Sequence, residues 1–428
     1  MKLEVQNSLI KDIKFSQTTQ IIDHVFFLNK DEMIAELKKI QFVRDVKIDV
    51  AKPGDKTRII PVKDCIEPRY RVDRPQGFPG VTTDSFQVGE GVTKVMKNVA
   101  VVTVGDIVGF QEGLIDMWGE GAKWTPFSKT LNVVVDISVE PGLDPHEHEH
   151  CTCLVGLKAS EYLALALKDA EVDECETFEL PGPGIEQEDL KGLPRVIYVQ
   201  MMIAQGLLHD VYIYGSDAKK ILPVLLHPNE ELDGAVISGN CVAACDKITT
   251  YQHQNNSVVK ELYKEHGKSL NFIGQILVPE LTTMDGKFKM CDYVVKLCRM
   301  LGAEGAVVSE EGYGNPDSDL VMIAKGLEDN KIQTVLITDE CTGWLGDSQP
   351  LTDTKEEAKA VISTGNVSHL VHLEQADTVL GNIAAISNIA GGWEGSYSST
   401  DGSITCELNA VIGSTSEIGY HNLTVRLH

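Results

Sequence analysis

A short segment near the middle of the chain could rearrange its own backbone. The apolar residues up to Ile237 predict a strand, and Ser238-Gly239-Asn240 follows as a turn that ends directly at the thiol of Cys241. Glycine adopts backbone conformations that other residues resist, so strain can be concentrated on the peptide bond after Asn240. The Cys241 sulfur can reach the carbonyl carbon of Asn240 through a five-membered ring. Such an attack would replace an amide with a labile thioester.

A base that removes the α-proton of Cys241 would complete this reaction. β-Elimination breaks the chain and leaves dehydroalanine, whose imine tautomer hydrolyses with loss of ammonia to a pyruvoyl group. The pyruvoyl ketone is an electrophile that the twenty side chains do not supply. It can form a Schiff base with an amine, which draws electrons from the adjacent bonds. Cys241 is therefore the predicted pyruvoyl precursor, and the bond between Asn240 and Cys241 is the predicted cleavage position.

Other interpretations of the same segment stay open. A cysteine after Gly-Asn is more often a small buried hydrophobic residue than a nucleophile. After the same cleavage, Cys241 could instead serve as the N-terminal nucleophile of an amidohydrolase. An uncleaved binding subunit is a third alternative. Cys241 and Cys245 could also form a redox disulfide, although their spacing is not that of a C-x-x-C pair.

Two histidine-containing segments supply further candidates. His253 could carry protons for elimination or Schiff-base formation, because imidazole titrates near neutral pH, and a structural hydrogen-bonding role is equally open. The run His146-Glu147-His148-Glu149-His150 contains H-E-x-x-H, which can bind zinc through two imidazoles one helical turn apart. A solvated helix start, or an acid-base cluster near the pyruvoyl group, explains this run without a metal. We assign no metal ligand from the sequence.

The composition restricts the partners and the location of the protein. With 63 Asp and Glu against 38 Lys and Arg, the formal net charge of −25 would repel nucleic acid and anionic membrane surfaces. No apolar run approaches the roughly 18 residues needed to span a bilayer, and the first residues do not form a signal-peptide core. The ten cysteines are irregularly spaced, which favours reduced thiols over a secreted disulfide framework. These observations predict a cytoplasmic protein.

The elements that must position these residues fall into three predicted regions. Residues 1–140 alternate short β-rich runs with turns and carry one clear helix at 30–39. Residues 141–267 contain an amphipathic helix, which begins at Asp144, and the segment with the cleavage position. In residues 268–428 strands and helices alternate, which is typical of an open, mostly parallel sheet covered by helices. We therefore predict a mixed α/β fold with a β-rich N-terminal region.

Polar residues follow successive predicted strands in the C-terminal region. Ligands of open parallel sheets gather at such strand ends, although ordinary turn chemistry explains the same residues. A dinucleotide fingerprint would need a third glycine where Asp317 follows Gly312 and Gly314, so we predict no nicotinamide site. The polar loops are residues 310–315, 339–340 and 364–366.

Motifs spread over the whole chain carry a family resemblance. The most specific one runs through residues 238–247 and continues through 249–256. The other matching segments, given in chain order, are residues 51–54, 58–64, 108–113, 126–130, 146–149, 314–317, 338–340 and 363–366. Together they resemble the component B α/β precursor, a proprotein, of glycine/sarcosine/betaine reductase. D-proline reductase has a related proprotein, but the length and the end-to-end match favour the glycine-type family.

The resemblance implies an oxidoreductase subunit that works within a hetero-oligomer. The precursor is cut before Cys241, which gives fragments of 240 and 188 residues, and these assemble with a separate selenocysteine-containing component B subunit. The pyruvoyl ketone binds the substrate amine, a selenium nucleophile attacks the α-carbon, and the carboxymethyl group passes to the small selenoprotein A. Thioredoxin supplies the reducing equivalents, and acetyl phosphate forms on another component.

The implied mechanism also bears on the substrate. A primary or secondary amine has a lone pair with which to attack a ketone, whereas a quaternary amine has none. A Schiff-base mechanism therefore favours glycine or sarcosine over betaine, although the betaine enzymes belong to the same family.

Overall fold

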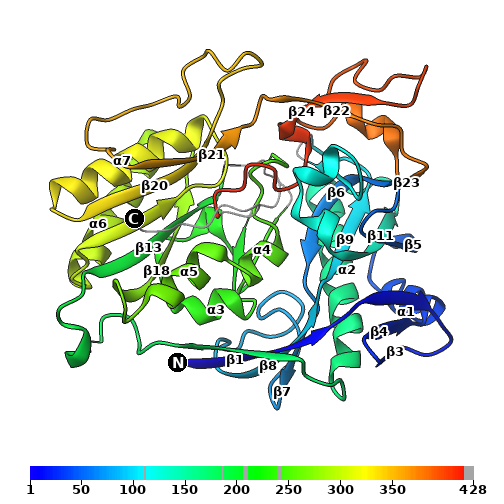
Figure 1. The fold of residues 1–428 in the computed structure, drawn as a ribbon, viewed down its shortest axis with the longest axis horizontal. Coiled ribbons are helices and arrows are strands. Elements are labelled where there is room, and N and C mark those ends of the chain that lie inside the picture. Colours follow the sequence, from blue (N-terminus) through cyan, green and yellow to red (C-terminus); the bar gives the residue numbers. More distant parts are fainter. Residues whose placement is uncertain (110–111, 186, 206–210, 240–242, 419–428) are drawn as a thin grey trace.

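The computed structural model describes residues 1–109, 112–185, 187–205, 211–239 and 243–418. A β-rich half and a half in which helices cover a mostly parallel sheet lie side by side (Figure 1). Most residues up to the end of β11 (Leu131–Val139) belong to the first half, and most residues after β18 (Asn271–Glu280) belong to the second. The mixed α/β class predicted from the sequence is confirmed.

The N-terminal sheet brings together strands that are distant in the sequence. β1 runs parallel to β8 and antiparallel to β12, and β8 runs antiparallel to β7. In spatial order the strands are β12 (Glu174–Glu179), β1 (Lys2–Leu9), β8 (Gly91–Lys97) and β7 (Arg69–Val72). A smaller three-stranded sheet consists of β2 (Asp12–Phe15), β4 (Val25–Leu28) and β3 (Gln20–Ile22).

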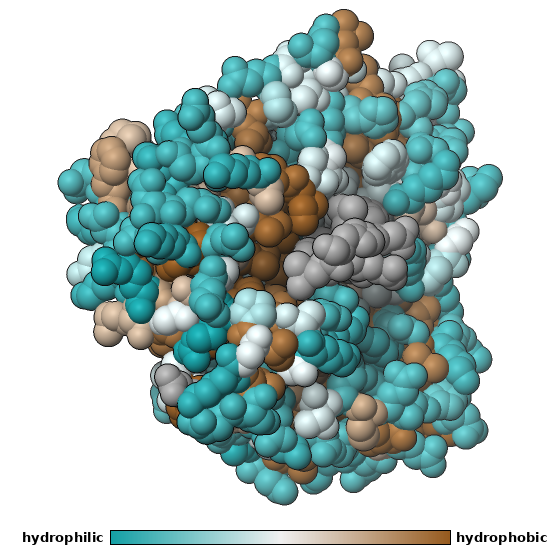
Figure 2. All heavy atoms as spheres, turned by 60° about the vertical axis from the view of Figure 1, so that its left-hand side comes forward, coloured by the Kyte–Doolittle hydropathy of each residue, from teal (hydrophilic) through white to brown (hydrophobic). Residues whose placement is uncertain are grey.

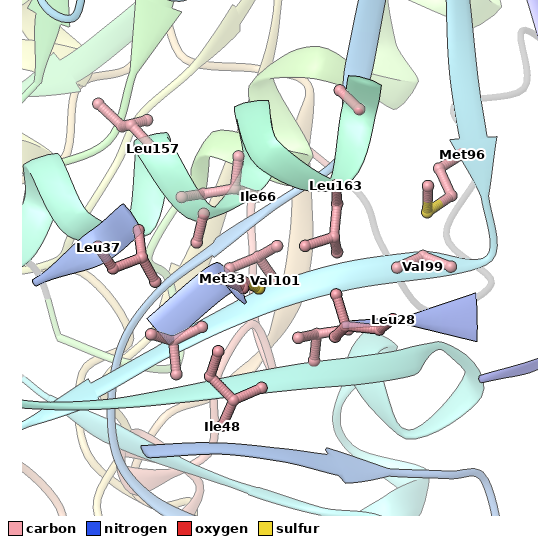
Figure 3. Close-up of a cluster of buried hydrophobic side chains, with 14 of the residues drawn as sticks. Leu28, Met33, Leu37, Ile48, Ile66, Met96, Val99, Val101, Leu157 and Leu163 are labelled. Carbon is pink, nitrogen blue, oxygen red and sulfur yellow. The ribbon is translucent and has the colours of Figure 1, made fainter. Parts of the chain in front are cut away.

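The second sheet forms the centre of the β-rich half. The helices α1 (Lys30–Leu37) and α2 (Pro145–Ala164) enclose an apolar core with it, to which Met33, Val101 and Leu163 contribute (Figure 3). This continuous core fixes α2, and with it the histidine run, against the sheet. In spatial order the strands are β10 (Gly113–Asp116), β6 (Thr57–Ile66), β9 (Val99–Gly105), β11 (Leu131–Val139) and β5 (Val43–Ala51), with β23 (Thr378–Gly381) also on β6.

The predicted start of α2 at Asp144 is confirmed. Its Oδ1 accepts hydrogen bonds from the backbone N–H groups of His146 (2.8 Å) and Glu147 (3.0 Å). Glu147 Oε2 accepts one in return from the Asp144 N–H (3.3 Å), which completes a capping box. The other predicted N-terminal helix, α1, begins where expected and ends two residues earlier than residue 39.

The other half contains the open, mostly parallel sheet that the strand-helix alternation predicts. All its pairings are parallel except that of β16 (Val224–Leu226) with β18. Successive residues of one strand point to opposite faces, so Ile197 packs with α6 (Met284–Met300) and α7 (Asn315–Asp329), and Tyr198 packs with α5 (Ser257–Glu265). In spatial order the strands are β16 (Val224–Leu226), β18 (Asn271–Glu280), β13 (Arg195–Ile203), β19 (Gly305–Ser309), β20 (Gln333–Glu340) and β21 (Val361–Asn366).

Two of the sheets contain strands from before and from after the predicted cleavage position in the sequence. β16 and β13 precede residue 240, whereas their neighbours β18 and β19 follow it. In the β-rich half, β23 follows that position and pairs with β6, which precedes it. A single fragment would expose unpaired strand edges in both sheets, because each sheet needs strands from the other fragment. The predicted fragments therefore share one fold. The boundaries predicted at residues 140 and 267 stay a prediction.

Short elements surround the cleavage segment. A three-stranded sheet consists of β15 (Ser216–Asp217), β14 (Tyr212–Ile213) and β17 (Val236–Ile237), and β22 (Leu370–Leu373) pairs with β24 (Ile404–Glu407). Two five-residue helices, α3 (Pro228–Leu232) and α4 (Thr250–Gln254), lie on either side of the cleavage position in sequence. Across the described ranges, no helix combines the length and the apolar character that crossing a membrane requires.

A mainly apolar groove of about 500 Å³ lies beside α5. Val196, Leu262 and Val307 help to line it, close to the ends at which the parallel strands begin. Figure 2 shows apolar residues gathered on the side of the molecule where the α/β half comes forward. The polar strand-end loops lie at the opposite ends of these strands, so the groove is separate from the site described below.

Candidate functional site

The predicted cleavage position lies outside the described residues, which omit Asn240, Cys241 and residue 242. The residues up to Gly239, those from Ala243 onward and the predicted proton carrier His253 are described. The site is therefore built from the groups that hold the two sides of this position.

A buried cation holds the backbone directly before the cleavage position. Nζ of Lys247 donates a hydrogen bond to the carbonyl oxygen of Gly239. The Ser238 hydroxyl donates to the same oxygen (3.0 Å), and the Ser238 N–H donates to Oγ1 of Thr250 (3.0 Å). Because all four residues are buried, water does not compete for these hydrogen bonds. The chain before Asn240 is thus fixed by three contacts.

A carboxyl group of β6 in the β-rich half holds the residues that follow Lys247. Asp64 accepts hydrogen bonds from the Thr250 N–H (3.0 Å) and from its hydroxyl (2.6 Å). Burial raises the pKa of the Asp64 carboxyl, and the Lys247 ammonium and the Thr250 hydrogen bonds oppose that rise. Asp64 therefore ties the segment after the cleavage position to a strand that lies 186 residues before Thr250.

His253 belongs to α4 and forms a buried pair with Glu231 of α3. Nδ1 of His253 lies 2.8 Å from Oε1 of Glu231, and both side chains are inaccessible to solvent. An ionised carboxylate only accepts hydrogen bonds, so the Nδ1 position carries the proton in this contact. The other ring nitrogen, Nε2, has no hydrogen-bond partner among the residues described. The pair can therefore take up a proton at Nε2 and stabilise the resulting imidazolium.

Amide side chains from two strands and a loop orient this pair. Gln275 of β18 donates a hydrogen bond to Oε2 of Glu231 (2.7 Å), and Asn256 donates a second one (3.1 Å). Both amides also donate to Oε1 of Gln200 on β13, at 2.6 and 3.1 Å. Donors on Oε2 leave Oε1 directed at His253, which fixes the imidazole ring in one orientation.

A group of buried carboxylates lies on the other side of the segment. Asp246 directly precedes Lys247, Glu310 and Asp339 stand where β19 and β20 end, and Glu417 belongs to the C-terminal segment. All four are fully buried. Burial, together with the neighbouring carboxylates, raises the pKa of Asp339 to about 8 and the pKa values of Asp246, Glu310 and Glu417 well above their usual range.

Residues 413–417, the C-terminal segment, form hydrogen bonds with the residues that follow the cleavage position. The Gly413 N–H donates to the carbonyl of Ala244 (2.7 Å), and the Thr415 N–H donates to that of Cys245 (2.9 Å). The Thr415 hydroxyl also donates to Oδ2 of Asp339 (2.9 Å). These contacts place Glu417 beside the other three buried carboxylates, although it is distant from them in the sequence.

The histidine run has a different environment. Oε2 of Glu147, the acid that a zinc protease would use as a base, caps α2. Glu149 and Glu112 both bind the buried ammonium of Lys63, at 2.7 and 3.0 Å. In the described ranges, one set of three or more His, Cys, Asp or Glu side chains is close enough to share a cation. It lies away from this run and consists of Cys245, Asp246 and Asp339, beside the buried carboxylates. Glu147 of this run and Asp144 thus form the cap of α2.

The sequence found part of this site and missed the rest. It named His253, and the strand-end prediction included Glu310 and Asp339, which do gather at the carboxyl ends of parallel strands. It missed Glu231 and the role of Lys247. Lys247 could have been noticed, since it closes the matched stretch 238–247. No local signal marks Glu231, because its partner lies 22 residues further along the chain.

Comparison with known proteins identifies the family of the chain. Residues 1–426 match the family model described as glycine/sarcosine/betaine reductase component B subunits. The chain belongs to this family. It is thus an amino-acid reductase component, which confirms the resemblance drawn from the motifs. No solved structure matches it significantly.

Individual relatives span the full chain. It is 47% identical over 427 residues to "Glycine reductase complex component B subunits alpha and beta" of Peptoclostridium acidaminophilum, and the alignment covers 100% of both chains. It is 43% identical to "Sarcosine reductase complex component B subunit alpha" of the same organism, again with 100% of both chains covered. A "D-proline reductase proprotein PrdA" of Acetoanaerobium sticklandii is 21% identical over 74% of this chain and 51% of its own length.

Proposed function

We propose that this chain is the precursor of a pyruvoyl-containing, substrate-binding component of an amino-acid reductase complex, and that it cleaves itself between Asn240 and Cys241. The observation that carries the proposal is the hydrogen bond from the buried Lys247 ammonium to the Gly239 carbonyl. A backbone anchored one residue before the cleavage position favours the five-membered ring through which the Cys241 sulfur reaches the Asn240 carbonyl.

His253 is the base in this proposal. Acylation of the Cys241 sulfur turns it into a good leaving group, so removal of the α-proton can expel it by β-elimination, and Nε2 of His253 is available to accept that proton among the described groups. Glu231 stabilises the imidazolium through Nδ1 (2.8 Å), because the buried carboxylate faces it directly. The upstream fragment then leaves with the sulfur as a thiocarboxylic acid, which water converts to a carboxylate and hydrogen sulfide.

The names of two relatives support processing. The glycine reductase relative is named as "subunits alpha and beta", although this chain matches it from end to end as one polypeptide. The D-proline reductase relative is named as a proprotein. If the strands of two subunits share a sheet, a precursor that contains both must fold before it is cut. β13, from the upstream fragment, lies between β18 and β19 of the downstream fragment, so the two fragments share a sheet in this way.

The pyruvoyl ketone supplies an electrophilic carbonyl for the amine of the substrate. A lone pair on that amine is required, so glycine or sarcosine is the proposed substrate. In the complex, the selenocysteine-containing component B subunit and selenoprotein A complete the reductive cleavage of the C–N bond. The buried carboxyl groups, Lys247 and His253 supply the ionisable groups around the segment that ends at the cleavage position.

Mass spectrometry of the denatured protein tests the processing. We expect two fragments, of which the downstream one has lost both the sulfur and the amino nitrogen of Cys241. Cys241→Ala should stay intact, and the matched thiol control Cys175→Ala, at an exposed position on β12, should be processed normally. A downstream fragment that begins with a free Cys241 would instead favour an N-terminal-nucleophile amidohydrolase. An intact wild-type chain from the native host would favour an uncleaved binding subunit.

A trapping experiment tests the substrate-binding role separately. Borohydride reduction in the presence of labelled glycine or sarcosine should attach the label to the downstream fragment of wild-type protein. The uncleaved Cys241→Ala variant should remain unlabelled. Failure of every candidate amine to label correctly processed protein would contradict amine binding while leaving self-cleavage intact.

A further inference from the structure

We infer that Cys245, Asp246 and Asp339 form a binding site for one divalent transition-metal cation, for which Zn²⁺ is the probe. A thiol and two carboxylates place one donor atom each within 4.8 Å of one another, and all three side chains are buried. Donors around a tetrahedral zinc ion lie about 3.3–3.8 Å apart when the bonds are 2.0–2.3 Å long. The three side chains therefore need only a small inward movement to bind the ion.

Unpartnered oxygen atoms point to a missing ligand at this place. Both carboxylate oxygens of Asp246 and Oδ1 of Asp339 have no hydrogen-bond partner within the described part of the chain. Both oxygens of Glu417 and the hydroxyl of Ser416 are likewise unpartnered. Buried polar atoms are nearly always paired in native proteins, so a concentration of such atoms in one place indicates a bound group. Glu417 is accordingly a fourth candidate ligand.

The carboxyl groups at this place are shielded from water. Asp246, Glu310, Asp339 and Glu417 are each fully buried. Lys247, the nearest lysine in sequence, directs its ammonium to the Gly239 carbonyl. A divalent cation would neutralise two of the carboxylates and coordinate the unpartnered oxygens at once.

The donor set selects the kind of cation. Calcium and magnesium take oxygen ligands, whereas a cysteine thiolate favours zinc and similar transition metals. The Cys245 thiol lies 3.7 Å from Oδ1 of Asn409, and its proton leaves when the sulfur binds a metal. Sequence reasoning assigned no metal here, because Asp339 lies 93 positions after Asp246 and no ligand spacing reveals the group.

Such an ion would connect the two ends of the downstream fragment. Cys245 and Asp246 lie shortly after the cleavage position, Asp339 ends β20, and Glu417 belongs to the C-terminal segment. Metal binding would therefore hold the residues just after Cys241 against the end of the parallel sheet. This positioning role rests on the proposed function, whereas the site itself does not.

Metal analysis of the full, untagged chain tests the inference. We expect about one zinc ion per chain after chelation, reloading with Zn²⁺ and removal of free metal. Asp246→Asn and Asp339→Asn should each lower bound zinc at least tenfold. The matched charge control Asp285→Asn, whose side chain is 91% exposed on α6, should bind as wild type does. Addition of Zn²⁺ should raise the melting temperature of wild type and control only.

Cobalt substitution of wild-type protein supplies a readout that does not depend on the folding of any variant. Co²⁺ bound to wild-type protein should give a thiolate-to-cobalt charge-transfer band, and Cys245→Ser should lose this band while wild type keeps it. Absence of the band, together with less than a tenth of an equivalent of zinc in wild-type protein, would overturn the inference. Cleavage is measured by mass in the same samples, so loss of metal without loss of cleavage is distinguished from failure of the proposed function.

Discussion

Nδ1 of His253 lies 2.8 Å from Oε1 of Glu231, and neither side chain is accessible to solvent. The two residues stand on opposite sides of the predicted cleavage position, on the short helices α4 and α3. Self-cleavage would therefore place the two members of one acid-base pair on different polypeptides. Such a pair can act during processing and afterwards, provided that the fragments stay together.

Replacement of His253 should slow processing. His253→Gln removes the proposed base while keeping a polar side chain beside Glu231, and general-base catalysis contributes about 10²–10⁴-fold. We expect cleavage at least about 100-fold slower, measured as the fraction of intact chain over time after synthesis. His372→Ala, at an exposed position on β22, is the control and should cleave at the wild-type rate. Normal cleavage of a folded His253→Gln variant would remove His253 from the mechanism.

Loss of Lys247 should destabilise the protein through Asp64. Lys247→Met removes a positive charge that opposes the burial-driven rise of the Asp64 pKa, and it removes a hydrogen bond from a charged donor, worth about 1.5–3 kcal/mol. Asp64→Asn in the same chain should recover part of that loss, because no uncompensated charge remains. Urea unfolding on the uncleaved Cys241→Ala background gives the four free energies of this cycle. Additive effects of the two substitutions would show that Lys247 and Asp64 act independently.

The two fragments should remain associated after cleavage. β13 pairs with β18 and β19, and β6 pairs with β23, so separation would break backbone hydrogen bonds in two sheets. Processed protein should therefore elute in size-exclusion chromatography at the volume of uncleaved Cys241→Ala, and separate only in denaturant. Two separate fragment peaks under native conditions would contradict the shared fold.

Acid should destabilise the protein through His227. Burial lowers the pKa of His227 to about 4, and the neutral ring accepts a hydrogen bond from the Asn229 N–H (3.2 Å) at Nδ1. The unfolded chain protonates this histidine near pH 6.5 and the folded chain only near pH 4, so stability falls as pH decreases between these values. The loss is at most about 3 kcal/mol.

A matched variant isolates this contribution. His227→Asn keeps a side-chain acceptor at the start of α3 and should show a smaller fall in unfolding free energy between pH 6.5 and 4 than wild type. The measurement is urea unfolding at several pH values. Equal slopes for the two proteins in this window would mean that another group controls the acid response.

Local features were predictable because they depend on neighbouring residues. The Asp144 capping box needs only residues within three positions, and the alternation of strands and helices after residue 268 reflects which face of each element is buried. The chemistry of a thiol after Gly239-Asn240 is equally local, so the sequence alone identified the cleavage position and His253 as candidates.

The tertiary structure decided which distant charges meet. Glu231 reaches His253, Asp64 supports the Lys247 segment, and Glu417 approaches Asp246 only because the sheet order brings their strands and loops together. Hydrophobic periodicity specifies the buried face of a strand but not its neighbour in the sheet, since many pairings bury the same face equally well. The sequence therefore determined the candidate reactive segment and the type of the strongly patterned elements, and long-range strand pairing determined the environment of that segment.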